Sequence, residues 1–281
     1  MRCNLYDVSV RHLAATPGGA NALNNVTLSI DQGEQIALVG PSGAGKTTLL
    51  HTLACAHQPA AGNMDISGID PWKLSHRARH ALRSELFLAP QTPPMPPRQR
   101  VVTAVLAGCL PRWSVWQALV SLIRPRNARA AFDALARFNL QDKLYARVDR
   151  LSGGERQRCG MARLLVSQAQ LFLVDEPLSA LDPTLAIQTL TTLQQESAAR
   201  NATLVCSLHQ VDLARAYFPR LIGLRDGRVV FDAPRADVTD AMIESLYRDA
   251  REQPSLTLVQ RAAINAEHDG APVIAAIPRC F

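Results

Sequence analysis

A stretch of nine residues, GPSGAGKTT at positions 40–48, constrains the fold of this chain most strongly. It follows the apolar run 36–39 and leads into the apolar residues 49–53, so we expect a strand, a glycine-rich loop and a helix. The spacing fits G-x-x-x-x-G-K-[ST], in which backbone N–H groups surround phosphate oxygens at a helix N-terminus. The sequence therefore predicts a nucleotide phosphate site formed by Gly40, Pro41, Ser42, Gly43, Ala44, Gly45, Lys46, Thr47 and Thr48.

Two side chains of this loop have chemical roles of their own. Lys46 is expected to place its positive charge beside the β- and γ-phosphates, and Thr47 to offer a hydroxyl to Mg²⁺. A plain turn before a helix would not need this combination of glycines, lysine and threonine.

The composition is that of a globular protein in a reducing compartment. The 281 residues are 47% hydrophobic, enough for one large α/β domain or two small ones. No apolar stretch reaches the roughly 18 to 20 residues that span a bilayer, and the N-terminus lacks the layout of a signal peptide, so we expect a cytoplasmic protein. The six cysteines are scattered without a C-x-x-C pair, which predicts neither a zinc site nor a disulfide framework.

The positive charge does not indicate a nucleic-acid partner. The formal net charge is +6, but the basic residues are spread along the chain. The densest cluster, residues 76–83, lacks interleaved aromatic residues and is typical of a solvated helix face. We therefore expect no binding of nucleic acid.

The hydrophobic pattern predicts an α/β core interrupted by a helical insertion. Strand-like runs at 5–10 and 26–30 predict an antiparallel β layer before the glycine loop. After a helix at 74–84 and a strand at 86–89, three helical patterns follow a proline-rich connection. We expect one domain over residues 1–250, with a helical subdomain at about 92–165, and a weakly ordered tail at 251–281. The predicted insertion helices lie around 101–108, 115–123 and 128–138.

Two further motifs carry chemistry. The apolar strand 171–174 runs into Asp175 and Glu176, which places both acids at the carboxyl edge of a nucleotide-binding sheet. We expect Asp175 to reach Mg²⁺ and Glu176 to act on an attacking water. The second motif opens a helix at 157–166 with a capping serine and adjacent glycines, typical of an anion-binding N-terminus. Its residues are Ser152, Gly153, Gly154 and Glu155.

Together these motifs resemble those of the ATP-binding subunits of ABC transporters. GPSGAGKT resembles the Walker A loop, LFLVDE the Walker B strand and LSGGE the family signature. Gln91 stands at the Q-loop position, Asp182 in the D-loop and His209 at the switch-histidine position, all in family order across about residues 4–247. Four sequence segments are similar to the phosphonate importer branch, at 207–215, 222–232, 105–108 and 113–123.

The resemblance implies a P-loop NTPase fold, with an antiparallel β subdomain and an all-helical insertion, that binds ATP and Mg²⁺. It implies catalytic roles for Glu176, His209 and Gln91, and Mg²⁺ ligation by Thr47, Gln91 and Asp175. It also implies a homodimer in which the signature of one copy closes over nucleotide held by the other. The expected partners are an integral membrane permease and, indirectly, a periplasmic phosphonate-binding protein, with the chain at the cytoplasmic face of the inner membrane.

Some positions depart from the family pattern. In the family, an aromatic residue near the N-terminus usually stacks under adenine. This chain has His12 at that position, and Tyr6 is an alternative stacking residue. The surroundings of Gln91 are unusually rich in proline, which is expected to stiffen that loop.

Two other functions fit the same motifs. One is a soluble ABC-type subunit of a phosphonate-degrading complex. The intact Glu176, Gln91 and helical insertion favour a transport function over this one. The other is a soluble ABC ATPase of translation or DNA repair. Such proteins usually carry two cassettes or long coiled coils, and the sequence shows neither.

Overall fold

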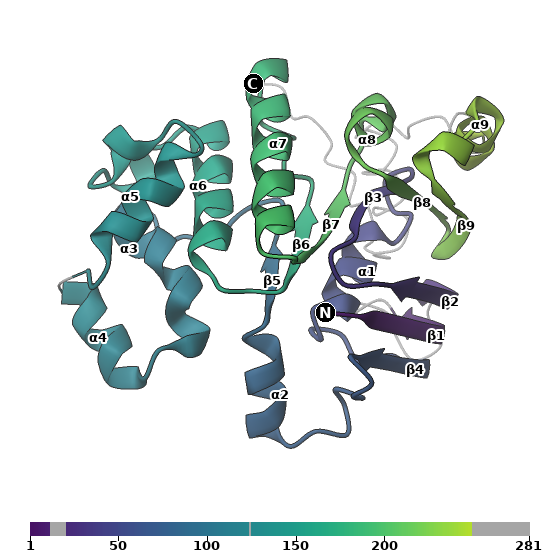
Figure 1. Cartoon of the computed structure of the whole chain (residues 1–281), viewed down its shortest axis with the longest axis horizontal. Helices are drawn as coiled ribbons and strands as arrows, with labels where there is room; N and C mark the ends of the chain where they lie inside the picture. The colour runs from purple at the N-terminus through teal and green to yellow at the C-terminus, as the bar shows by residue number, and fades with distance from the viewer. Residues whose placement is uncertain (12–20, 124, 249–281) are drawn as a thin grey trace, which may run out of the picture. The chain divides into compact units, whose positions relative to one another are not determined.

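The computed structural model describes residues 1–11, 21–123 and 125–248 (Figure 1). The chain divides into two units, Met1–Leu246 and Tyr247–Phe281, and the elements below belong to the first unit up to Leu246. The tail expected at 251–281 lies outside the described residues. Within the described ranges, no helix is both long and apolar enough to cross a membrane.

The first unit is built on a six-stranded sheet with the order β5-β6-β7-β3-β8-β9. All neighbours pair in parallel except β8 and β9, which are antiparallel and joined by a turn at Asp226 and Gly227. Strands β3, β6 and β7 are almost entirely buried, which explains their continuous apolar runs. The residues that follow parallel strands meet at one edge of the sheet. The strands are β3 (Gln35–Val39), β5 (Leu86–Ala89), β6 (Leu171–Asp175), β7 (Thr203–Ser207), β8 (Arg220–Arg225) and β9 (Arg228–Pro234).

A second, antiparallel sheet has the order β2-β1-β4. The strands expected at 5–10 and 26–30 are β1 (Cys3–Arg11) and β2 (Asn21–Ile30), both longer than predicted. The third strand is β4 (Ala61–Ile66), from the far side of the glycine loop. Side chains of β2 alternate between buried and exposed from residue 26 to residue 30, because one face of the sheet covers the core.

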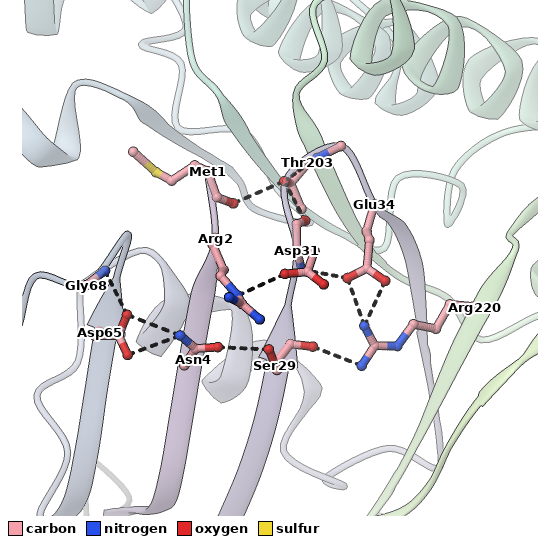
Figure 2. Close-up of polar contacts among 11 residues, drawn as sticks. Met1, Arg2, Asn4, Ser29, Asp31, Glu34, Asp65, Gly68, Thr203 and Arg220 are labelled. Carbon is pink, nitrogen blue, oxygen red and sulfur yellow. Dashed lines mark hydrogen bonds and ion pairs between the residues drawn. The ribbon is translucent and has the colours of Figure 1, made fainter.

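A polar network ties the two sheets together (Figure 2). Arg220 on β8 contacts both carboxylate oxygens of Glu34 at 2.8 and 3.0 Å and donates to the Ser29 carbonyl at 2.9 Å. The Ser29 hydroxyl donates to Asn4 at 2.8 Å, and Asn4 donates to Asp65 on β4. The network therefore crosses β4, β1 and β2 and fixes them to the sheet that carries the glycine loop.

The helical insertion gathers beside the six-stranded sheet (Figure 1). Helices α3 and α5 both pack against α6, and α4 follows the short 3₁₀ helix η1 (Ala107–Arg112). Helix α6 begins at Gly153, four residues before the predicted start, because the signature residues cap it. The helices are α1 (Lys46–Leu53), α2 (His76–Arg83), α3 (Val101–Leu106), α4 (Val115–Ile123), α5 (Ala128–Ala136), α6 (Gly153–Val166), α7 (Pro183–Ala199), α8 (Val211–Tyr217) and α9 (Asp240–Tyr247).

Candidate nucleotide-binding and hydrolysis site

The glycine loop connects the buried strand β3 to helix α1. Gly40 has φ 150°, and an added Cβ there would lie 2.0 Å from the Leu224 carbonyl oxygen. Gly45 caps α1 in the left-handed region with φ 101° and provides no side-chain cap. The first N–H groups of α1 therefore point into the loop without a side-chain partner, which is the arrangement that binds phosphate.

A pocket of about 180 Å³ lies inside this loop and is lined by residues 42–48 together with Glu176. Lys46 is only 5% exposed, and its Nζ donates to the carbonyl oxygens of Gly40 at 2.7 Å and Pro41 at 3.0 Å. Burial lowers the pKa of Lys46, whereas the charges of Glu176 and Asp175 act in the opposite direction. The pocket thus combines backbone donors with one nearly buried cation, and it suits a polyphosphate.

Three oxygen-bearing side chains meet next to the pocket. The Thr47 hydroxyl donates to Asp175 Oδ2 at 2.8 Å, and the Ser207 hydroxyl donates to Asp175 Oδ1 at 2.6 Å. Asp175 ends β6 and is 5% exposed. Hydroxyl and carboxylate oxygens are hard donors of the kind that Mg²⁺ prefers, so Thr47 and Asp175 fit the ion predicted from the sequence.

Glu176 lies at the centre of the predicted catalytic residues. Gln91 Nε2 donates to Glu176 Oε2 at 2.7 Å, and His209 Nε2 contacts Glu176 Oε1. The backbone of Glu176 is in the left-handed region, with φ 47°, and its N–H donates to the Ser207 hydroxyl at 2.9 Å. The structure therefore brings together three side chains that are far apart in the sequence, and one of them lines the phosphate pocket.

The signature motif forms the N-terminus of α6. Ser152 Oγ accepts the N–H of Glu155 at 3.2 Å, and Glu155 accepts the N–H of Ser152 at 2.8 Å, which is a capping box. The hydrogen bond from the Ser152 backbone is the main reason why the pKa of Glu155 is lowered. A Cβ added to Gly154 would lie 2.6 Å from the Ala180 carbonyl oxygen. Asp182 caps the N-terminus of α7.

The residues that line the phosphate pocket come from the loop and Glu176, and the signature residues are not among them. Over residues 23–179 the chain matches the family model described as ABC transporter. This chain belongs to the ABC transporter family. It is an ATP-binding subunit with an ABC ATPase fold, and the matched range includes the glycine loop, the end of β6 and the cap of α6.

Relatives of this ABC subunit match it over most of their length. It is 55% identical to the phosphonates import ATP-binding protein PhnC 2 of Albidiferax ferrireducens, covering 98% of this chain and 99% of the relative. It is 57% identical to PhnC of Polaromonas sp., covering 88% and 89%. It is 50% identical to PhnC 1 of Pseudomonas aeruginosa, covering 93% and 95%.

Solved structures share the ABC fold at low sequence identity. One is a dimeric ATP-binding cassette in a post-hydrolysis state bound to ADP and Pi, with a TM-score of 0.72, 24% identity and coverage of 83% of this chain and 98% of that one. Another is an ATP-binding subunit of an ABC transporter, with a TM-score of 0.68, 21% identity and coverage of 94% and 100%. These likenesses agree with the two-sheet core and the helical insertion described above.

The residue that stacks on adenine is not identified among the described residues. His12 lies outside them. The Walker A loop approaches β2 at Ala22 and Leu23, and Leu23 pairs with Val10 of β1. Tyr6 lies four residues earlier on β1, which is about 13 Å along a strand. The structure therefore does not place Tyr6 beside the loop.

The prolines beside Gln91 connect its loop to the signature helix. An added Cβ on Gly160 of α6 would lie 2.5 Å from Pro93, and Arg163 Nη1 donates to the Pro94 carbonyl at 3.3 Å. The loop that begins at Gln91 therefore packs directly on α6.

Two positioning residues were missed by sequence reasoning. Ser207 ends β7 in register with Asp175 and holds both Asp175 and the backbone of Glu176. Gln157 on α6 is 3% exposed and donates to the Glu176 carbonyl at 2.6 Å, while its Oε1 accepts the N–H of Ala180 at 3.2 Å. Ser207 could have been found from its place at the end of the strand next to Walker B; Gln157 carries no such signal.

Replacing Ser207 with alanine is expected to slow ATP hydrolysis by about tenfold, because one hydroxyl orients two acidic residues at once. Steady-state phosphate release measures the effect, with Ser245→Ala on α9 as the matched control. Ser207→Thr keeps the hydroxyl and is expected to recover part of the rate, which a purely structural role for this buried position would not predict. Equal rates for wild type and Ser207→Ala would contradict the assignment.

Proposed function

We propose that this chain powers the import of phosphonates, or closely related phosphorus oxyanions, by hydrolysing ATP beneath a separate membrane permease. The observation that carries the substrate class is the match at 46–57% identity, over 88% or more of this chain, to proteins named as phosphonates import ATP-binding proteins. Substrate would not touch this chain, whose own chemistry is at the γ-phosphate.

We assign the cis half of the active site to the Walker A loop, Asp175 and Glu176. Lys46 and the loop N–H groups would hold the phosphates, as their burial and orientation support. Glu176 would accept a proton from the attacking water, with Gln91 and His209 holding its two carboxylate oxygens. Catalysis would then rest mostly on positioning and on neutralising charge.

Thr47, Asp175 and Gln91 would hold Mg²⁺. Gln91 donates its Nε2 to Glu176, so its carbonyl oxygen is the atom for the ion. When bound, Mg²⁺ supplies positive charge to the phosphate oxygens.

The trans half would come from a second copy of this chain. A solved cassette of the same fold is a dimer bound to ADP and Pi, which supports this assembly. In this proposal Ser152, Gly153 and Gly154 of one copy contact the γ-phosphate in the other, through the N-terminus of α6. Glu155 would act by capping that helix.

We further propose that the pair sits peripherally at the cytoplasmic face of the inner membrane. There it would bind an integral permease and respond indirectly to a periplasmic phosphonate-binding protein. The helical insertion would receive the permease, because the Gln91 loop joins the active site to α6.

The rival function is an ABC-type subunit of a soluble phosphonate-degrading complex. Loss of either function would prevent growth on phosphonates, so uptake has to be measured directly. A deletion strain is expected to lose accumulation of a radiolabelled phosphonate, while phosphate uptake is unchanged. The wild-type gene is expected to restore it and the Glu176→Gln gene is not. Normal accumulation followed by failure to break the carbon–phosphorus bond would favour the rival.

A further inference from the structure

Helix α4 turns three of its large apolar side chains outward. Val115 is 79% exposed, Trp116 73% and Leu119 52%. Their spacing places them on one face of the helix, whereas Ser121 is only 3% exposed. A helix that only borders water carries polar residues on its outer face, so this arrangement indicates a partner.

The surrounding part of the chain is strongly basic. From position 70 to position 133 the sequence has ten lysines and arginines and three acids, Asp70, Glu85 and Asp133. Each acid is paired with one basic residue, Lys73, Arg112 and Arg129 respectively, so the acids offset only part of the positive charge. Helix α2 has no acidic residue and exposes Arg77 and His80.

Helices α2 and α4 lie on the same side of the first unit. The Arg112–Glu85 ion pair joins the end of η1 to the residue just beyond α2, and η1 contacts α2. Helix α4 begins three residues after Arg112. Both helices accordingly lie in the lower part of the view in Figure 1.

We propose that this basic–apolar face, formed by Arg77, His80, Val115, Trp116 and Leu119, contacts the anionic headgroups of a lipid bilayer directly. Tryptophan prefers the headgroup region, and each basic residue near an anionic surface adds attraction. An apolar partner protein would match α4 alone, whereas anionic lipid matches α4 and the basic excess together. The inference rests on the proposed function, because a subunit beneath a permease is within reach of the bilayer.

The contact is separate from the nucleotide site. None of the five residues of the basic–apolar face lines the phosphate pocket. Lipid binding should therefore need no ATP, and it should weaken as salt screens the charges. It would add a second point of attachment for the subunit beside the permease.

Sedimentation of the full chain with vesicles tests this inference. Vesicles of equal parts phosphatidylglycerol and phosphatidylcholine are expected to bind wild-type protein, and pure phosphatidylcholine vesicles much less. Trp116→Ser/Leu119→Ser is expected to weaken binding at least ~10-fold. Arg77→Ser is expected to weaken it about fivefold. Tyr145→Ser, at a side chain 62% exposed elsewhere in the insertion, is the matched control and is expected to bind normally.

The outcomes separate lipid from protein partners. Absence of wild-type binding, or equal binding to both vesicle types, would overturn the inference. Binding only to vesicles that contain the permease would also overturn it and assign the face to that protein. ATP hydrolysis by the free subunit is expected to be the same for all these variants. Phosphonate uptake is measured separately, in the deletion strain described above. Failure of the proposed function is therefore distinguished from failure of lipid binding.

Discussion

Replacing Lys46 with alanine is expected to reduce ATP hydrolysis by at least ~100-fold and to weaken nucleotide binding. Lys46 is the nearly buried cation of a pocket otherwise lined by backbone donors, small side chains and Glu176, so the phosphates would lose the charge that offsets their own. Phosphate release under saturating ATP measures the rate, and a fluorescent nucleotide titration measures the affinity.

Lys73→Ala is the matched control. Lys73 is exposed and pairs with Asp70 at 3.3 Å, outside the pocket, so this variant should hydrolyse ATP at the wild-type rate. Thermal unfolding distinguishes loss of function from loss of fold, because a variant that still unfolds cooperatively above the assay temperature is folded when its turnover is measured. Wild-type turnover by folded Lys46→Ala would mean that the phosphates bind elsewhere.

Glu176→Gln is expected to lower hydrolysis by roughly 100- to 10,000-fold while ATP binding is retained. Glutamine has nearly the same shape but does not accept a proton from water. Its amide still allows contacts with Gln91 and His209, so the loss should appear in kcat and not in the dissociation constant. Single-turnover phosphate release separates these two quantities.

The control for this prediction is Glu244→Gln, at an exposed position on α9. It removes the same charge from the chain without touching the site. Undiminished hydrolysis by Glu176→Gln would transfer the role of base to another group, and His209→Ala would then be expected to stop the reaction.

The elements that depend on local pattern were predicted from the sequence. The bounds of β5 and α4 agree with the predicted ranges 86–89 and 115–123. Apolar runs, helical spacing and turn residues act over a few neighbours, so they can be recognised without knowing the fold. The resemblance to ABC transporter subunits is confirmed by the family model and the relatives.

The parts that depend on distant pairing were not predicted. Strand β4 joins β1 across the glycine loop, and Ser207 reaches Asp175 only because β6 and β7 lie in register. Helix α6 begins early because Ser152 and Glu155 cap each other, a local motif that was recognised only as a serine cap. The apolar spacing of α4 is typical of a core helix, yet packing leaves Val115, Trp116 and Leu119 exposed.

We propose above that the active site is divided between two copies of this chain. Sedimentation velocity of Glu176→Gln with and without ATP tests it most directly, with Lys46→Ala/Glu176→Gln as the control that should not respond to ATP. We expect a species of 30.6 kDa without nucleotide and twice that mass with ATP, carrying two nucleotides per pair. A protein that binds ATP and stays at the monomer mass, or that dimerises equally well without ATP, would contradict the divided site.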